Sequence, residues 1–239
     1  DLKSKGFRLS CVSGYEENNQ ARFAAVWEKG TGPTIATHHQ LTSDEYQDKY
    51  TQYKNLGYKL KYVNAFPVNG AVFYSAIWMD EDGPDVKGFH GMTSAQYQAK
   101  YDDMKQLGYR LVNVSGVAVG NTPYFAGVWR KEAGPDIATH HMLTAAQYQQ
   151  KYTEYKNLGY RLMQVNNYAV GNTPYFAGIW RKTTGPVLLS HHGLSEENYQ
   201  TTVLNYYYSG YSIEATSACV VNGKTIFSAI WNEGEFDHD

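Results

Sequence analysis

The pattern of apolar and polar residues repeats along this chain with a period of 51 residues. The stretch Gly120–Lys131 (GNTPYFAGVWRK) recurs as Gly171–Lys182 with one change, Val128 to Ile179. A repeat of this size cannot bury its own apolar face and must pack against its neighbours. The 239 residues therefore predict one domain of coupled units, although length alone would allow one or two domains.

Each unit predicts two strands, a loop and a helix. In the third copy, the first strand covers Tyr109–Val114, Gly120-Asn121 forms the turn, and the second strand ends at Phe125–Trp129. Both faces of the second strand are apolar, so we expect it to lie buried between layers. A Gly-Pro loop and a His segment, which we also expect to be a loop, lead into the helix. That helix opens with a capping box such as Thr42 and Glu45.

Counted from equivalent glycines, the units are residues 6–56, 57–107, 108–158, 159–209 and 210–239, and residues 1–5 look like the tail of a helix. The predicted fold class is α+β, with five tandem ββα repeats, about ten strands and four full helices. An open solenoid normally has polar caps on its end repeats. Because both end hairpins keep the apolar pattern, we expect the units to close into a pseudo-five-fold, propeller-like ring spanning residues 1–239.

The two cysteines bear on this ring. Cys11 lies in the first strand of the first unit, and Cys219 lies near the hairpin of the fifth. They are far apart in sequence and would be neighbours only in a ring. A disulfide would staple that ring and indicate an oxidising compartment. The alternative is two free, buried thiols.

Composition excludes some classes of function. The net charge of −2 comes from scattered charges, which argues against a nucleic-acid footprint. The chain contains no run of 18 apolar residues, so no membrane span is predicted. The 22 tyrosines suit packing between helices and sheets as well as binding.

The start at Asp1 indicates a processed chain or a fragment. The sequon at Asn113 falls in a predicted strand, so we interpret it as a chance match.

The combined motifs resemble a known repeat. The 51-residue unit, the GYR start, the Trp-ended strand, the Gly-Pro loop and the LT-x-x-Q-Y helix are similar to the bacterial tandem repeat domain. That domain is also the N-terminal domain of fungal polyglycine hydrolases. The resemblance covers essentially the whole chain and implies an accessory or binding role in an extracellular setting.

The catalytic half of those fungal proteins is a serine hydrolase that resembles class C β-lactamases. Its nucleophile needs a Ser-x-x-Lys pattern. No serine of this chain has lysine three residues on; for example, Ser43 is followed by Tyr46. The protease activity is therefore not carried over to this chain.

Histidines are the main polar candidates. His39, His90, His141 and His192 share one repeat position, and His38, His140 and His191 precede three of them, with Phe89 in the fourth place. Such a histidine can orient its loop by a hydrogen bond to a neighbouring unit. It can also bind an anion or a metal. Adjacent histidines in an extended segment point opposite ways, so a metal would need one histidine from each of several units on the ring axis. His238 could serve for the fifth unit.

We expect a secreted, noncatalytic, multivalent binding module that needs no cofactor, because near-identical units offer several equal sites. The expected ligand is a glycan, bound in lectin-like fashion, or a protein. Sugar rings stack on aromatic faces, so the site would include Tyr, the Gly-Pro loop, the His segment and five tryptophans. These are Trp27, Trp78, Trp129, Trp180 and Trp231. The alternatives are an enzyme or metal protein with one axial His site, and a structural or storage repeat.

Overall fold

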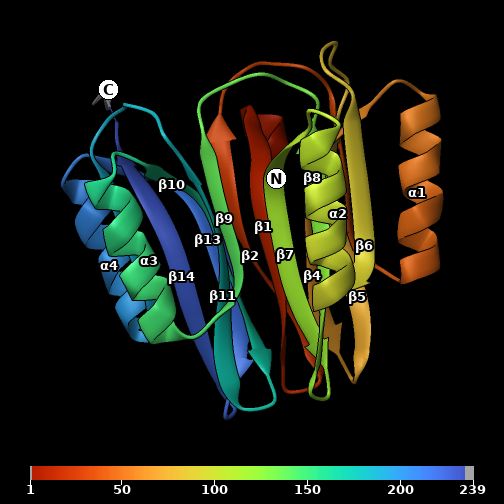
Figure 1. Cartoon of the computed structure of the whole chain (residues 1–239). Helices are drawn as coiled ribbons and strands as arrows, with labels where there is room; N and C mark the ends of the chain where they lie inside the picture. Colours follow the sequence, from red (N-terminus) through yellow and green to blue (C-terminus); the bar gives the residue numbers. More distant parts are fainter. Residues whose placement is uncertain (1, 235–239) are drawn as a thin grey trace.

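The structure is a computed structural model that describes residues 2–234 (Figure 1). The strands are β1 (Phe7–Glu17), β2 (Gln20–Lys29), β3 (Ile35–Leu41), β4 (Lys59–Val68), β5 (Ala71–Met79), β6 (Val86–Thr93), β7 (Arg110–Val119), β8 (Thr122–Arg130), β9 (Ile137–Leu143), β10 (Arg161–Val170), β11 (Thr173–Arg181), β12 (Leu188–Ser195), β13 (Tyr211–Val221) and β14 (Lys224–Glu233). The helices are the 3-10 turn η1 (Lys3–Lys5) and the α-helices α1 (Ser43–Asn55), α2 (Ser94–Gln106), α3 (Ala145–Asn157) and α4 (Glu196–Tyr208).

The strands form five antiparallel sheets. Sheet 1 contains β1 and β2, and sheets 2 to 5 have the orders β3-β5-β4, β6-β8-β7, β9-β11-β10 and β12-β14-β13. The repeated α+β architecture is as predicted, but there are 14 strands instead of ten. The extra strands are the His segments β3, β6, β9 and β12, here called the outer strands, which were predicted to be loops. Their β-branched residues, such as Ile35 and Thr37, suit a strand, and they pair with the far edge of each Trp-containing strand.

This pairing crosses the boundaries of the units counted from the glycines. Ala36 of β3 lies opposite Trp78 of β5, which belongs to the following hairpin. A complete three-stranded sheet therefore consists of an outer strand and the hairpin that follows it in the chain. The helix lies between these two parts, and the whole unit begins at the Gly-Pro loop. The structural unit is displaced along the chain from the units 6–56 to 210–239.

Each α-helix begins and ends where the sequence predicts. Thr42, Thr93 and Thr144 form capping boxes with the third helical residue, and Ser195 caps α4 through its side chain alone. Glycines with positive φ follow the helices, as Gly57 does after α1 with φ 88°. The four α-helices lie on the outside of the sheets (Figure 1). No helix within residues 2–234 is long and apolar enough to span a membrane.

The first strand of each hairpin, here called the inner strand, faces the neighbouring sheets. The inner strands contact one another in the order β1, β4, β7, β10 and β13, and β13 also contacts β1. The hairpin turns gather at one end of the molecule, at the bottom of Figure 1. The first and last units are thus neighbours. The closed ring in solution stays a prediction, and the joint described next provides a direct test.

One small polar side chain on each inner strand joins it to its neighbour. This polar set consists of Ser13, Asn64, Ser115, Asn166 and Ser217, each only 1–3% exposed. Each side-chain oxygen accepts a hydrogen bond from a main-chain N–H of the adjacent inner strand. The pairs are Gly14–Asn64 (2.7 Å), Ala65–Ser115 (2.9 Å), Gly116–Asn166 (2.7 Å), Asn167–Ser217 (3.0 Å) and Ala218–Ser13 (2.9 Å). The last pair, between β13 and β1, uses the same repeat positions as the others.

Side chains next to the polar set match in size across three of the five joints. A Cβ atom on Gly116 would lie 2.5 Å from the Tyr168 ring, and one on Gly14 would lie 2.4 Å from Phe66. In the second unit, Ala65 replaces the glycine, and the next unit has Val117 in place of the larger aromatic residue. The glycines are thus required by the aromatic ring of the following unit, because a side chain would occupy the same space.

The structure decides between a disulfide and two free thiols for the cysteines. Both Cys11 and Cys219 are free and buried. Cys11 Sγ donates to the carbonyl oxygen of Thr216 at 3.4 Å, so Cys219 lies three residues further along β13 than the residue that Cys11 contacts. Three residues span roughly 10 Å, beyond the roughly 4–7 Å between Cα atoms that a disulfide requires. The predicted staple is absent from the described structure, although these strands are in contact.

Candidate functional site

The tryptophans are mostly unavailable to a ligand. Trp78, Trp129, Trp180 and Trp231 are 0–1% exposed, because an outer strand and a helix cover each of them. Only Trp27 is partly open, at 38%. Sugar stacking on five equivalent tryptophan faces is therefore excluded in this structure. The apolar pattern on both faces of these strands is satisfied by protein packing.

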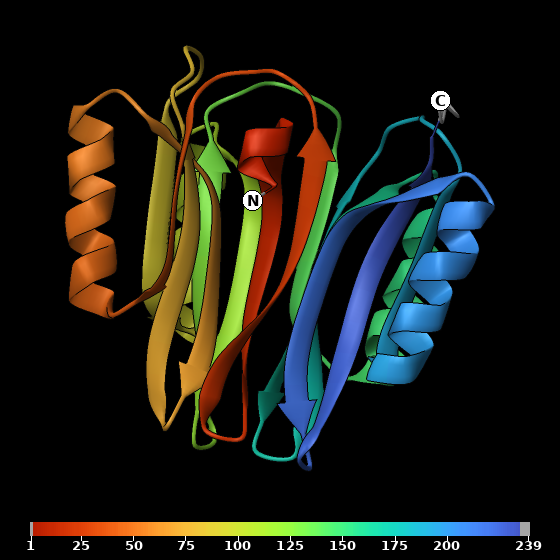
Figure 2. The ribbon, with the colours of Figure 1, turned by 180° about the vertical axis from the view of Figure 1, so that it is seen from behind.

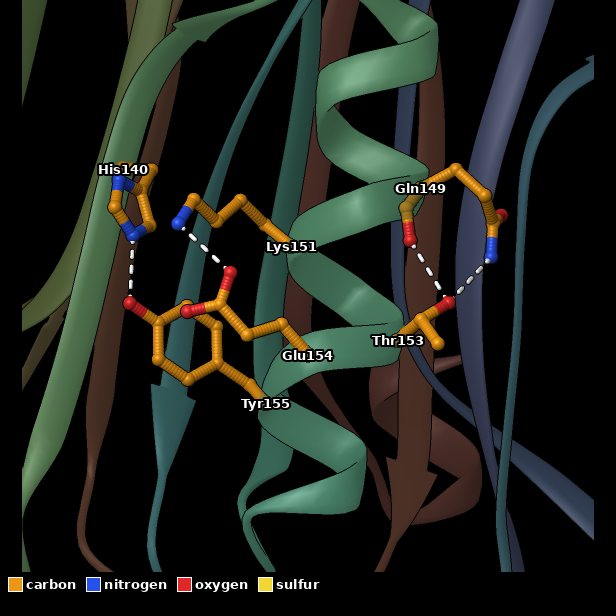
Figure 3. Close-up of polar contacts among 6 residues, drawn as sticks. All are labelled: His140, Gln149, Lys151, Thr153, Glu154 and Tyr155. Atoms are coloured by element: carbon orange, nitrogen blue, oxygen red, sulfur yellow. Dashed lines mark hydrogen bonds and ion pairs between the residues drawn. The ribbon is translucent and has the colours of Figure 1, made fainter.

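The first histidine series pairs with tyrosines of the helix that follows. His38, His140 and His191 each place Nε2 within 2.6–2.8 Å of a tyrosine hydroxyl, as His140 does with Tyr155 (Figure 3). In the second unit, Phe89 takes the histidine position and Met104 takes the tyrosine position. Both members of the pair change together from polar to apolar. This exchange identifies the pair as a helix-to-strand contact and not as a ligand site.

The second histidine series faces the helix of the preceding sheet. His90 Nε2 lies 3.0 Å from Ser43 Oγ, and His141 Nε2 lies 2.9 Å from Ser94 Oγ. The ring of His192 lies 5.0 Å from that of Tyr148, edge to face. Neighbouring histidines thus point to opposite sides, as predicted. They hold adjacent sheets together through side chains on the helix of the preceding sheet.

The predicted axial histidine site is not formed by the described residues. His39, His90, His141 and His192 lie on the outer strands β3, β6, β9 and β12, whereas it is the inner strands that contact one another from unit to unit. Residues 2–234 contain no group of three or more His, Cys, Asp and Glu side chains placed to hold a metal. His238, suggested as a fifth member, lies outside the described residues.

Burial affects the protonation of most of these histidines. Desolvation lowers the pKa of His38, His90, His140, His141, His191 and His192, because the charged imidazolium loses contact with water. For His38 and His140, a nearby lysine on the following helix lowers the pKa further. These histidines are therefore neutral packing groups near pH 7.

Four grooves recur between adjacent sheets, at the end opposite the hairpin turns. Grooves 1 to 4 have volumes of about 340, 170, 710 and 300 Å³. Each is lined by a lysine from the end of a helix and by an aromatic residue at the start of an inner strand. The lysine–aromatic pairs are Lys3 and Phe7, Lys54 and Tyr58, Lys105 and Tyr109, and Lys156 and Tyr160. The Gly-Pro loop lines grooves 1, 3 and 4, and the tryptophan edge lines grooves 1, 2 and 4.

The grooves are positively charged although the chain is not. Grooves 1 and 4 are each lined by two cationic residues and no acidic residue. Groove 2 has two cationic residues and one acidic residue, and groove 3 has three cationic and two acidic residues. Arg8, Arg110 and Arg161 are held in place by carbonyl oxygens of the Gly-Pro loops. The helix-end lysines are not among the site residues predicted from the sequence, although they recur at one repeat position.

A different pocket lies at the hairpin end, where all five inner strands meet. It has a volume of about 300 Å³ and contains residues from every unit, among them Tyr15, Phe66, Val117, Tyr168 and Cys219. Asn64 and Asn166 of the polar set also line this pocket. Among the described residues that line it, Glu16 is the only Asp, Glu, Lys, Arg or His. The pocket is mainly apolar with amide groups, and none of the predicted site residues except Cys219 lies in it.

The sequence model of one protein family, described as "Polyglycine hydrolase-like, structural repeat", matches five consecutive segments. They are residues 1–30, 32–81, 83–132, 134–183 and 185–234. The last four begin at the glycine of a Gly-Pro loop, and each contains one complete sheet with its helix. The first segment corresponds to sheet 1. Because these matches cover nearly the entire sequence, the chain belongs to the polyglycine hydrolase-like structural repeat family.

Proposed function

We propose that this protein is a noncatalytic, multivalent binding module that acts outside the cell and uses grooves 1 to 4. The recurrence of a lysine and an aromatic ring in four equivalent grooves supports the proposal. Several weak, equal sites gain avidity when the ligand is long enough to reach two or more of them. The ligand should therefore be a polymer with repeating groups.

An acidic glycan suits these grooves best. Sugar rings pack on aromatic faces, and Tyr58, Tyr109 and Tyr160 supply such faces. Lys131 and Lys182 lie 5.6 and 5.8 Å from the ring centres of Tyr109 and Tyr160, which adds positive charge beside two of them. The excess of cations in every groove favours a carboxylated or sulfated chain over a neutral one.

A matched pair of triple variants tests this proposal. K54A/K105A/K156A removes a lysine from grooves 2, 3 and 4, whereas K49A/K100A/K151A removes three lysines from the same helices outside these grooves. Both variants change the net charge equally. Binding to arrayed carboxylated and sulfated glycans should fall by at least about tenfold for the first and much less for the second.

The other outcomes would contradict the proposal or favour a different function. Equal losses for the two variants would indicate nonspecific charge attraction and contradict groove binding. Binding of neutral glycans alone would refute the acidic-ligand proposal. An array without any binding would favour a protein ligand or a structural or storage role. Single-lysine variants should lose less than the triple variant, since avidity depends on the number of intact grooves.

The hairpin-end pocket supports a second candidate function. Its residues come from all five units, its volume suits one small molecule, and its lining is largely apolar with little charge. Such a site would take a small, uncharged ligand with hydrogen-bonding groups. Ala118→Trp would fill this pocket, and Ala99→Trp on the exposed side of α2 is the control. Loss of small-ligand binding only in the first variant is the expected result.

A further inference from the structure

The repeated groove pattern changes at the end of α4. At the ends of α1, α2 and α3, the chain has a lysine, then Asn or Gln, then Leu, in Lys54–Leu56, Lys105–Leu107 and Lys156–Leu158. At the same repeat position, α4 is followed into its turn by Tyr207, Tyr208 and Ser209. The last turn of α4 contains no basic residue, unlike that of the other three helices. Two aromatic rings thus replace the cation of the grooves.

The main chain at this position is the same as in the grooves. Gly210 N donates to Tyr207 O at 3.1 Å, as Gly159 N does to Lys156 O. Tyr207 therefore stands where a groove lysine stands. Figure 2 shows α4 on the outside of sheet 5, joined to β13 at the end of the molecule opposite the hairpin turns. The two tyrosines, here called the tyrosine pair, lie at the same end of the molecule as grooves 1 to 4.

Both rings of the tyrosine pair are open to solvent. Tyr208 is 82% exposed and Tyr207 is 57% exposed, and their ring centres lie 5.5 Å apart. The preceding Tyr206 packs against the sheet: its hydroxyl lies 2.6 Å from His191 Nε2, and its ring centre lies 5.2 Å from that of Trp231. Because Tyr206 fixes this turn to sheet 5, the pair is presented on a firm support. Tyrosines presented in this way are typical of binding surfaces.

The chemistry of the tyrosine pair suits a sugar without charge. A tyrosine ring offers an apolar face to the C–H groups of a sugar, and its hydroxyl can donate and accept hydrogen bonds with sugar hydroxyls. The grooves combine such a ring with a lysine, which favours acidic groups. The last turn of α4 supplies the rings without the cation. It therefore keeps the attraction for a sugar face and loses the preference for a negative charge.

We propose that the tyrosine pair, Tyr207 and Tyr208, is a separate stacking site for a neutral sugar unit. This inference rests on the proposed glycan function and narrows the ligand to a chain that combines acidic and neutral sugars. The acidic units occupy grooves 1 to 4, and a neutral unit stacks at the end of α4. A neutral oligosaccharide also binds there by itself, but more weakly than the mixed chain, because it gains no avidity from the grooves.

Replacing the tyrosine pair by its counterpart in the third unit tests this site. Y207K/Y208N copies Lys156 and Asn157, which the repeat already carries at this position. The probes are neutral oligosaccharides of glucose, mannose and N-acetylglucosamine, titrated and followed by NMR. At least one should bind the unchanged protein, and Y207K/Y208N should weaken that binding at least about tenfold. L204A, which removes another exposed apolar side chain of α4, should bind like the unchanged protein.

The reciprocal exchange should create a site. K156Y/N157Y/L158S places the Tyr-Tyr-Ser sequence at the end of α3 and should add a second neutral-sugar site to the chain. Far-UV circular dichroism and the urea midpoint of Y207K/Y208N should stay unchanged, since both replaced side chains lie mostly in solvent. A loss of sugar binding by this variant then reports on the site and not on folding.

Three results would overturn the proposal. They are no binding of any of the three probes, equal binding by Y207K/Y208N, and a dimer of the free protein that Y207K/Y208N converts to monomers in light scattering. The last result would assign the pair to an interface between copies. The groove proposal is tested separately, because Y207K/Y208N keeps grooves 1 to 4 and should bind carboxylated glycans at least as well as the unchanged protein. Acidic-glycan binding without any neutral-sugar binding would leave the groove proposal standing.

Discussion

Sheet 1 and sheet 3 contain nearly the same hairpin in different surroundings. FAAVW at Phe23–Trp27 and FAGVW at Phe125–Trp129 differ by one methyl group, yet only the second is fully buried. The difference comes from the outer strand and the helix, which precede each complete hairpin in the chain. Burial of a repeat residue is therefore decided by a neighbouring segment and not by the hairpin sequence.

Removing the tryptophan should separate the two sheets most strongly. Trp129→Ala should lower the free energy of unfolding by about 3–5 kcal/mol, because it leaves a cavity in a packed core. Trp27→Ala should cost clearly less, since that ring is already partly in water. Urea denaturation of the two variants measures both values. Equal losses would mean that sheet 1 is as well covered in solution as sheet 3.

Size matching across the joints predicts a rescue. Gly116→Ala should destabilise the protein by about 1–3 kcal/mol, because the new methyl group collides with Tyr168. Adding Tyr168→Val reproduces the natural Ala65–Val117 combination and should recover part of that loss. A double-mutant cycle by urea denaturation gives the coupling. Additive losses would contradict direct contact between the two positions.

Three serines of the polar set test closure between the first and last units. Ser115→Ala and Ser217→Ala each remove the acceptor of a buried main-chain N–H and should cost about 1–2 kcal/mol. Ser13→Ala should cost the same if β13 and β1 stay joined in solution. A negligible effect of Ser13→Ala, with the other two destabilising, would indicate an open arc.

Acid should lower the free energy of unfolding by a smaller amount than these substitutions. The pKa of six histidines is lower in the folded protein than in the unfolded chain, so the unfolded chain binds protons first as the pH falls below 6.5. The free energy of unfolding should therefore decrease as the pH falls from about 6.5 through the folded-state pKa values. H140F/Y155M, which copies the Phe89–Met104 pair, should show a smaller decrease between pH 7.5 and 5.5. An unchanged pH dependence in this variant would exclude His140 as a contributor.

Reducing agent should have the smallest effect, namely none. Cys11 and Cys219 are free, and the melting temperature should be the same with and without dithiothreitol. Free-thiol titration of the unfolded protein should find two thiols per chain. A lower melting temperature on reduction would restore the disulfide alternative.

Much of the architecture was readable from the sequence. The period, the hairpins, the helix caps and the neighbouring positions of the first and last units follow from local patterns that recur at a fixed interval. The outer strands were missed because a histidine pair beside Gly-Pro resembles a loop. Their pairing partner lies in the next hairpin, and no local pattern shows that partner. The tryptophans were misjudged for the same reason, since the segment that buries them lies elsewhere in the chain.

The polar set was also missed, although its signal was present. Ser13, Asn64, Ser115, Asn166 and Ser217 occupy one repeat position with small polar residues only, in the middle of an apolar strand. A buried polar position of this kind needs a partner. Ser115 belongs to the sequon at Asn113, and Asn113 itself is only 2% exposed, which agrees with a chance match. The grooves could not be foreseen, because they arise only where adjacent sheets meet.

The joint between Gly14 and Asn64 has a direction, since one unit contributes the donor and the next contributes the acceptor. Because the donor and acceptor positions are the same in every unit, this hydrogen bond can form between any two copies, while the size of the side chains beside it still decides how well two neighbours pack. Duplication of one 51-codon segment would hence yield a protein whose new copy already carries the donor and the acceptor for both neighbours. Circular permutation at a Gly-Pro loop should be tolerated on the same grounds. Growth of such proteins by whole units therefore requires no prior invention of a new interface.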